Sequence, residues 1–212
     1  MRIRRPLVLA AAAALLPGLA ACGGLVARPQ LHTYRLAYLP PAASPPRLAG
    51  TVRVMPFGIA ATYDSQSFVY RESPYDIAVD PYHQWIAAPA AMITDLVARD
   101  LAAADAFAAV LQAPSALPAS YELSGWIETF EERDDAGCVA HVRLRALFVR
   151  VPPRGAREVL FEESLTGDEA CTAGDPDAFA AAMSRAVQRL SDEIRGRAVA
   201  AAQQPPAAPD MP

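Results

Sequence analysis

The 212-residue chain contains no lysine and no asparagine, so all nineteen basic residues are arginine. Both missing residues have A-rich codons, and this bias indicates a GC-rich bacterial genome rather than any particular chemistry. The formal net charge is −4 at pH 7. Removing residues 1–21, which carry three arginines, leaves 16 arginines against 23 acidic residues, a formal charge of about −7. A nucleic-acid partner is not indicated, because such a partner requires a basic face.

The sequence also lacks the motifs that mark common catalytic sites. It has no H-E-x-x-H, no C-x-x-C, no G-x-S-x-G and no glycine-rich phosphate loop. Of the three histidines, His32 belongs to the tether, His83 stands among aromatics in "PYHQW", and His141 is expected on the outward face of a strand. We therefore predict a protein that is not an enzyme, with no catalytic residues, no metal site and no cofactor. A hydrolase that uses His83 is the enzymatic alternative.

Long apolar runs are missing except near the N-terminus. Three arginines precede an apolar stretch, Leu7–Leu16, which is followed by Pro17, Gly18 and small residues. This is the layout of a secretory signal. Because the run is far shorter than the roughly 20 residues of a transmembrane helix, we predict that residues 1–21 are a signal peptide that is removed.

The signal ends in Leu19-Ala20-Ala21-Cys22, which resembles the bacterial lipobox. The resemblance implies that Cys22 is the lipidation site and carries acyl chains such as palmitate. At about 0.8 kcal/mol per buried CH₂, even two chains hold a protein stably on a bilayer. Residues 22–32 are then a lipidated tether. Gly23, rather than aspartate, follows the cysteine and favours an outer-membrane lipoprotein facing the periplasm of a bacterial cell envelope, with the inner membrane as the alternative.

Two further cysteines, Cys138 and Cys171, are expected to form a disulfide, because an exported chain enters a compartment where disulfides persist. The bridge would close a loop of about 34 residues and stabilise the fold by about 3 to 4 kcal/mol in the chain-entropy model. The alternative is two separate buried thiols.

Hydrophobic periodicity predicts an α/β fold: a mixed, largely antiparallel sheet with two main helices packed against it. One helix is expected over about 87–104, and a second begins with the cap Asp175 and ends at Gly196. Residues 33–198 form one domain, and the proline- and alanine-rich residues 199–212 are expected to be a disordered tail. The second helix has an apolar stripe of Phe179, Met183, Val187, Leu190 and Ile194.

Strands are expected at 33–39, 51–57, 67–73, 75–79, 121–132, 138–151 and 157–167. The turn "RDDAG" predicts that 121–132 and 138–151 form an antiparallel hairpin. Acidic side chains on the first and third of the last three strands flank arginines on the middle one, which favours a charge ladder on a solvated face. An active-site carboxylate cluster is the alternative. The acidic residues are Glu128, Glu131, Glu132, Glu158, Glu162 and Glu163.

Four aromatic residues gather before the first helix: Tyr70, Tyr75, Tyr82 and Trp85. Aromatic side chains bring a large contact area at a small entropic cost, so these residues are candidates for partner binding. The alternative is that they cover the core beneath the helix, and Trp85, next to the helix start, favours that reading.

The order of these features resembles a known family. After the lipobox come "YRL", "VRVMPF", the long "SFVYRESPYDIAVDPYHQWIAAPAAMITDLVARDL" and a closing amphipathic helix. Over 34–195 the chain is similar to the ABC-type transport auxiliary lipoproteins.

This resemblance implies a non-catalytic adaptor in lipid transport, and a possible homo-oligomer. The implied partners are a protein with a mammalian-cell-entry domain and its ABC permease and ATPase. The alternative is a structural or assembly lipoprotein of the outer membrane without a role in lipid transport.

Overall fold

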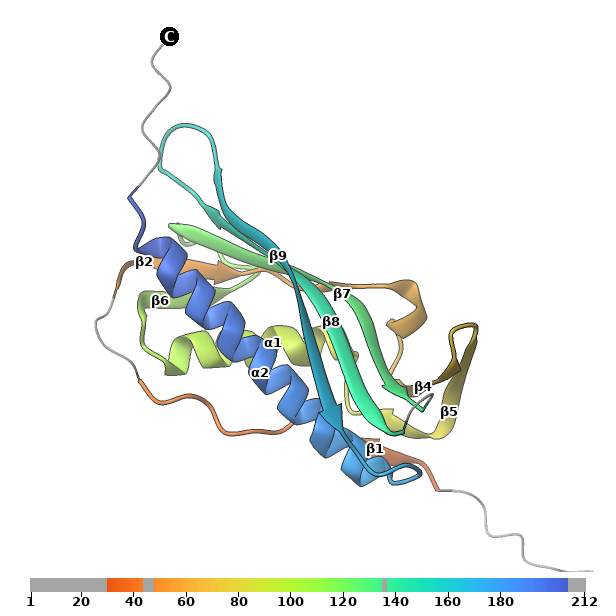
Figure 1. Cartoon of the computed structure of the whole chain (residues 1–212). Coiled ribbons are helices and arrows are strands. Elements are labelled where there is room, and N and C mark those ends of the chain that lie inside the picture. Colours follow the sequence, from red (N-terminus) through yellow and green to blue (C-terminus); the bar gives the residue numbers. More distant parts are fainter. Residues whose placement is uncertain (1–29, 44–47, 135–136, 206–212) are drawn as a thin grey trace, which may run out of the picture. The chain divides into compact units, whose positions relative to one another are not determined.

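The structure, a computed structural model, describes residues 30–43, 48–134 and 137–205 (Figure 1). The predicted signal peptide, Cys22 and most of the tether lie outside these residues. The elements are β1 (His32–Tyr34), β2 (Leu48–Val54), β3 (Gly58–Ile59), the 3₁₀ turn η1 (Ala61–Tyr63), β4 (Ser67–Ser73), β5 (Asp76–Trp85), α1 (Pro89–Ala103), β6 (Phe107–Gln112), β7 (Tyr121–Arg133), β8 (Val139–Arg150), β9 (Glu158–Ala170) and α2 (Pro176–Ala202).

The sheet is mixed, with β7 at its centre. Strands β2, β3 and β4 each pair with β7 in parallel, and β8 pairs with it antiparallel along its length. The remaining pairs are β4–β5 and β8–β9, which are antiparallel, and β1–β5 and β2–β6, which are parallel. The predicted α/β class and the predicted hairpin of β7 and β8 are confirmed. The prediction of a largely antiparallel sheet is wrong, because pairing between segments distant in the sequence leaves no turn signal.

The two helices cover one face of the sheet (Figure 1). Helix α2 packs on β8 and β9, and α1 packs against α2 and β6. The predicted α2 stripe is fully buried. At its N-terminal end Phe179 joins an aromatic cluster in which the Phe68 ring lies 4.5 Å from Trp85 and 5.0 Å from Phe179, between centroids. This cluster connects α2 to the strands that lead into α1.

The end of α2 differs from the prediction. The helix passes through Gly196 and continues to Ala202, with Ala198 and Ala201 buried against the domain. A helical glycine costs only about 1 kcal/mol relative to alanine, and burial of the following turns offsets that cost. Residues 199–202 therefore belong to the domain and not to the tail. Over the ranges that the structure describes, no helix is both long and apolar enough to span a membrane.

Candidate functional site

The β4–β5 hairpin carries a group of exposed apolar side chains. Tyr75, in its turn, is 99% exposed, and Ile77, Val79 and Tyr82 on β5 are also exposed. An exposed group of large apolar side chains marks an interaction site more often than scattered single ones do. These four residues are called the β5 surface from here on, and they are the candidate docking site.

The structure separates the four aromatic residues that the sequence singled out. Tyr75 and Tyr82 belong to the β5 surface. Trp85 is buried in the core, and Tyr70 is half-buried, with its hydroxyl donating to Asp80 Oδ2 at 2.9 Å. Ile77 and Val79 were missed, although their alternation with Asp76 and Ala78 already indicated a strand with one apolar face.

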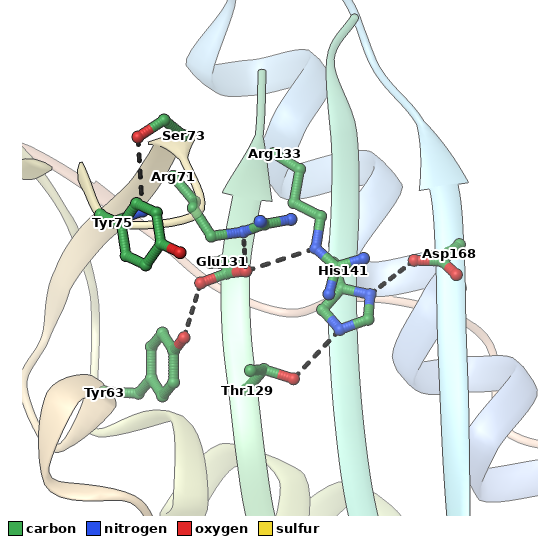
Figure 2. A network of polar contacts seen from close by, with 9 residues as sticks. All are labelled: Tyr63, Arg71, Ser73, Tyr75, Thr129, Glu131, Arg133, His141 and Asp168. Atoms are coloured by element: carbon green, nitrogen blue, oxygen red, sulfur yellow. Dashed lines mark hydrogen bonds and ion pairs between the residues drawn. The ribbon is translucent and has the colours of Figure 1, made fainter. Parts of the chain in front are cut away.

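A buried carboxylate fixes this hairpin to the centre of the sheet (Figure 2). Glu131 on β7 is 1% exposed, and it accepts hydrogen bonds from Tyr63 Oη at 2.6 Å, Arg71 Nε at 2.8 Å and Arg133 Nε at 3.3 Å. A buried charge is costly unless it is paired in this way. Burial, together with the hydrogen bond to Glu131, raises the pKa of Tyr63, so this hydroxyl remains a donor.

Glu131 and Glu132 were expected on a solvated face, and for both residues that prediction is wrong, because both are buried. Strand β4 pairs in parallel with the end of β7, at Tyr70–Glu132 and Arg71–Arg133, and so covers this part of the strand. Elsewhere the expected charge ladder is present. Arg143 contacts Glu128 at 2.9 Å, and Arg145 lies 3.8 Å from Glu162.

On the opposite face of the hairpin, Asp80 organises a bulge in β5. Its Oδ1 accepts hydrogen bonds from the backbone N–H of Tyr82 at 2.7 Å and of His83 at 2.9 Å, and its Oδ2 lies 2.8 Å from His83 Nδ1. Burial works to raise the pKa of Asp80, but these bonds and the one from Tyr70 outweigh it and lower the pKa. The ionised carboxylate thus holds the bulge, and His83 serves as its hydrogen-bonding partner.

The same face borders a small acidic cleft of about 320 Å³. One of its residues, Glu132, is buried, and burial followed by the nearby charge of Asp134 raises its pKa to about 7. Its Oε1 lies 3.1 Å from Cys138 Sγ, but a disulfide sulfur has no proton to donate to a carboxylate. The lining residues are Tyr70, Glu72, Asp80, His83, Glu132, Asp134, Gly174, Asp175 and Pro176.

Cys138 and Cys171 form a disulfide that joins the start of β8 to the end of β9, with Cα atoms 5.1 Å apart. The Cys171 N–H also donates to the Cys138 carbonyl at 3.0 Å. Glu132 and the two sulfurs lie within 4.8 Å of one another, as a group of metal ligands would. Because the sulfurs are bonded to each other, neither offers the thiolate that a metal ion needs.

His141 links three strands in the middle of the sheet (Figure 2). Its Nδ1 lies 2.6 Å from Asp168 Oδ1 on β9, and its Nε2 lies 3.1 Å from Thr129 Oγ1 on β7. The ring was expected to face outward, but it is 3% exposed. Burial lowers its pKa, against the opposing effect of Asp168. The order hydroxyl, imidazole, carboxylate is that of a catalytic triad, but a ring enclosed between strands acts as a cross-strand bridge.

A larger cleft, of about 880 Å³, has lining residues from β2, β7, β8 and the end of α2. Its arginines are engaged with neighbouring groups. Arg53 and Arg157 contact the two carboxylate oxygens of Glu122, at 3.0 and 2.7 Å, and Arg150 contacts Glu158 at 2.6 Å. These contacts hold the surrounding strands and loops together, which accounts for the charges of this cleft.

Comparison with known proteins gives the class to which this fold and these polar clusters belong. Residues 34–195 match the family of the ABC-type transport auxiliary lipoprotein component. The chain belongs to this family, whose lipoprotein character corresponds to a location in the cell envelope.

Solved structures show the same fold. A Xanthomonas campestris protein of family DUF330 has 20% identity and a TM-score of 0.70, over 82% of this chain and 97% of its own. An uncharacterized protein has 12% identity and a TM-score of 0.61, over 79% and 97%. A hypothetical protein of Chlamydia trachomatis has 15% identity and a TM-score of 0.53, over 74% and 99%. A search of curated protein sequences finds no match.

Proposed function

We propose that this protein is a lipid-anchored, non-catalytic adaptor of an ABC-type lipid transport system that includes a mammalian-cell-entry domain protein. Membership of the auxiliary lipoprotein family carries the proposal. The polar clusters add support, because Glu131, Asp80 and His141 are each engaged in holding strands together.

The anchor fits the physical problem of moving lipid. Acyl chains expose apolar area to water at a cost of about 25 cal/mol per Å², so lipid crossing the periplasm needs a shielded route. His32, expected in the tether, belongs to β1. The remaining residues 23–31 reach at most about 30 Å, which keeps the domain close to its membrane. Tethering raises the local concentration of a docking domain, so that weak contacts to the transporter suffice.

In this proposal Cys22 carries the acyl chains, the protein sits in the outer membrane and faces the periplasm, and the β5 surface contacts the mammalian-cell-entry protein. Assembly of several copies into a homo-oligomer would multiply these contacts. The exposed apolar residues of the β5 surface support a docking role, because a monomer gains nothing by exposing them to water.

Metabolic labelling with an alkyne analogue of palmitate tests the anchor. We expect the wild type to take up the label and Cys22→Ala to lose it. A Cys138→Ser/Cys171→Ser variant is the control, because it lacks the other two cysteines, keeps Cys22 and should therefore keep the label. Labelling of Cys22→Ala at the wild-type level would contradict the anchor.

The transport role is tested by cross-linking in the native cell, followed by purification of the full-length protein. We expect the mammalian-cell-entry protein and the permease to co-purify with the wild type. Recovery of the wild type without any transporter component would contradict the transport role, whatever the labelling shows.

A further inference from the structure

Strand β5 has an unpaired outer edge. On one side it pairs with β4, and on the other β1 pairs only with His83, Gln84 and Trp85. Leu31, just before β1, is exposed and outside the pairing. Over the part of the chain that the structure describes, no strand therefore pairs with the outer edge of β5 at 76–80, which ends before Pro81, a residue without an N–H, and before Tyr82, whose N–H donates to Asp80. Such an edge presents free backbone N–H and C=O groups, which another strand can satisfy.

The two faces beside this edge differ in chemistry. The pairs Val69–Val79 and Arg71–Ile77 place Ile77 and Val79 on one face, where their side chains are exposed. The pair Tyr70–Ala78 lies on the other face, together with Asp80 and the acidic cleft. Because successive side chains of a strand point to opposite faces, an added strand would place alternate residues in an apolar and in an acidic environment.

The acidic cleft selects for positive charge. Glu72, Asp80, Asp134 and Asp175 line it beside Glu132, and no arginine is among its lining residues. A cleft lined by charge of one sign attracts the opposite charge and disfavours partners of like charge. The residues of an added strand that point to this face should accordingly be arginine or lysine.

We infer that the edge of β5 binds an extended segment of the transporter partner as an additional strand, in which apolar residues alternate with basic ones. The regular part of the edge, 76–80, accommodates about five residues of that segment, since the Asp80 bulge ends it. The identity of the partner rests on the proposed function, whereas the chemistry of the segment rests on the edge itself.

Contacts within the protein already fix the position of the β4–β5 hairpin before a partner strand binds. Arg71 is held by Glu131 on one face, and Tyr70 by Asp80 on the other. The Asp134 N–H also donates to the Arg71 carbonyl at 3.1 Å. A surface that is already ordered loses little entropy when a partner strand docks.

A synthetic probe tests the edge directly. The probe is a labelled seven-residue peptide of alternating valine and arginine, and the target is the full-length lipidated protein in nanodiscs of zwitterionic lipid. We expect the peptide to bind and to slow amide hydrogen exchange at 76–79. Two further peptides carry N-methyl groups on all valines or on all arginines. Since only one set of N–H groups faces β5, one of these peptides should bind at least tenfold more weakly than the parent.

Variants locate the site. Ile77→Ser/Val79→Ser should weaken peptide binding at least tenfold, and Glu72→Gln should weaken it about threefold with a smaller dependence on salt. Val159→Ser is the matched control, because Val159 on β9 is 61% exposed and Val79 is 58% exposed. Equal binding of the parent and both N-methylated peptides, or an equal loss in Val159→Ser, would overturn the inference.

Co-purification in the native cell separates this inference from the proposed function. We expect the Ile77→Ser/Val79→Ser protein to lose the transporter and to keep its own oligomeric state. If this variant retains the transporter, the edge is not the docking site, although the adaptor role stands. If it retains the transporter and loses only self-association, the occupant is a second copy, and the inference is wrong. If the wild type brings down no transporter while the peptide binds, only the adaptor role fails.

Discussion

Two edge strands of the sheet, β9 and β5, are built in opposite ways. Both pair along most of their length with only one neighbour, β8 for β9 and β4 for β5. The exposed side chains of β9 are mostly polar, and two arginines of α2 donate to backbone carbonyls at its end, Arg189 to Asp168 and Arg185 to Ala170. The exposed side chains of β5 are mostly apolar, and its edge at 76–79 has no such cover from the described residues.

Charged residues and covering side chains are the usual means by which proteins prevent strand edges from pairing with other chains. The fold applies these means along β9, whereas in β5 the charge of Asp76, the Asp80 bulge and Pro81 stand only at the two ends of the apolar segment. The exposure of Ile77 and Val79 is therefore specific to the edge of β5, because arginines and polar side chains protect the edge of β9 in the same sheet.

The largest effect is expected at the protected edge. Cys138→Ala/Cys171→Ala removes a crosslink between residues separated by 33 positions and should lower the free energy of unfolding by about 4 kcal/mol. Urea titration of the purified protein measures the loss, and reduction of the wild type should reproduce it. Amide exchange should accelerate first at the ends of β8 and β9. A loss below about 1 kcal/mol would show that the base of this edge is held by other contacts.

The next largest loss of stability is expected where Glu131 on β7 holds the β4–β5 hairpin. Glu131→Gln leaves Arg71 and Arg133 without their shared carboxylate and should lower the free energy of unfolding by about 3 kcal/mol. Tyr63→Phe removes a single bond to the same carboxylate and should cost about 1.5 kcal/mol. Exchange should increase in β4 and β5 but not in β9. An increase of equal size in both regions would mean that the network stabilises the whole sheet rather than the hairpin.

The pH dependence of stability probes the acidic side of the same hairpin. Burial raises the pKa of Glu132 from 4.5 to about 7, so between these values the folded protein binds more protons than the unfolded chain. Stability should therefore fall as pH rises from about 4.5 to about 7, by about 2 to 3 kcal/mol from this group.

Glu132→Gln should remove that contribution. The quantity to compare is the difference in urea midpoint between variant and wild type at pH 5 and at pH 8, because His141 and other groups titrate in both proteins. A difference that does not change with pH would contradict the assignment to Glu132.

The smallest effect on stability is expected at the edges themselves. Val79→Lys and Val159→Lys replace exposed side chains, and each should change the free energy of unfolding by less than about 0.5 kcal/mol. Only Val79→Lys should reduce recovery of the transporter in cross-linking experiments. Equal reduction by both variants would remove the distinction between the two edges.

Local sequence patterns predicted some of these structural features correctly and others wrongly. The alternation in β7 and β8 with the turn between them predicted their hairpin, and the apolar spacing from Phe179 to Ile194 predicted the buried face of α2. These patterns are local, with periods set by the backbone geometry of strands and helices. The same logic failed at His141 and Glu131, whose alternation indicates an outward face, because other parts of the chain cover that face.

The sequence by itself predicted the two helices and the long strands β7, β8 and β9, and it singled out the aromatic segment around Tyr75, since each depends on residues close together in the chain. The export signal stays a prediction. Only the tertiary structure decided that β7 takes parallel partners, that Tyr70 and Trp85 turn inward, and that no described strand covers the outer edge of β5 at 76–79. Burial and strand pairing depend on which distant segment arrives beside a residue, and no local periodicity carries that information.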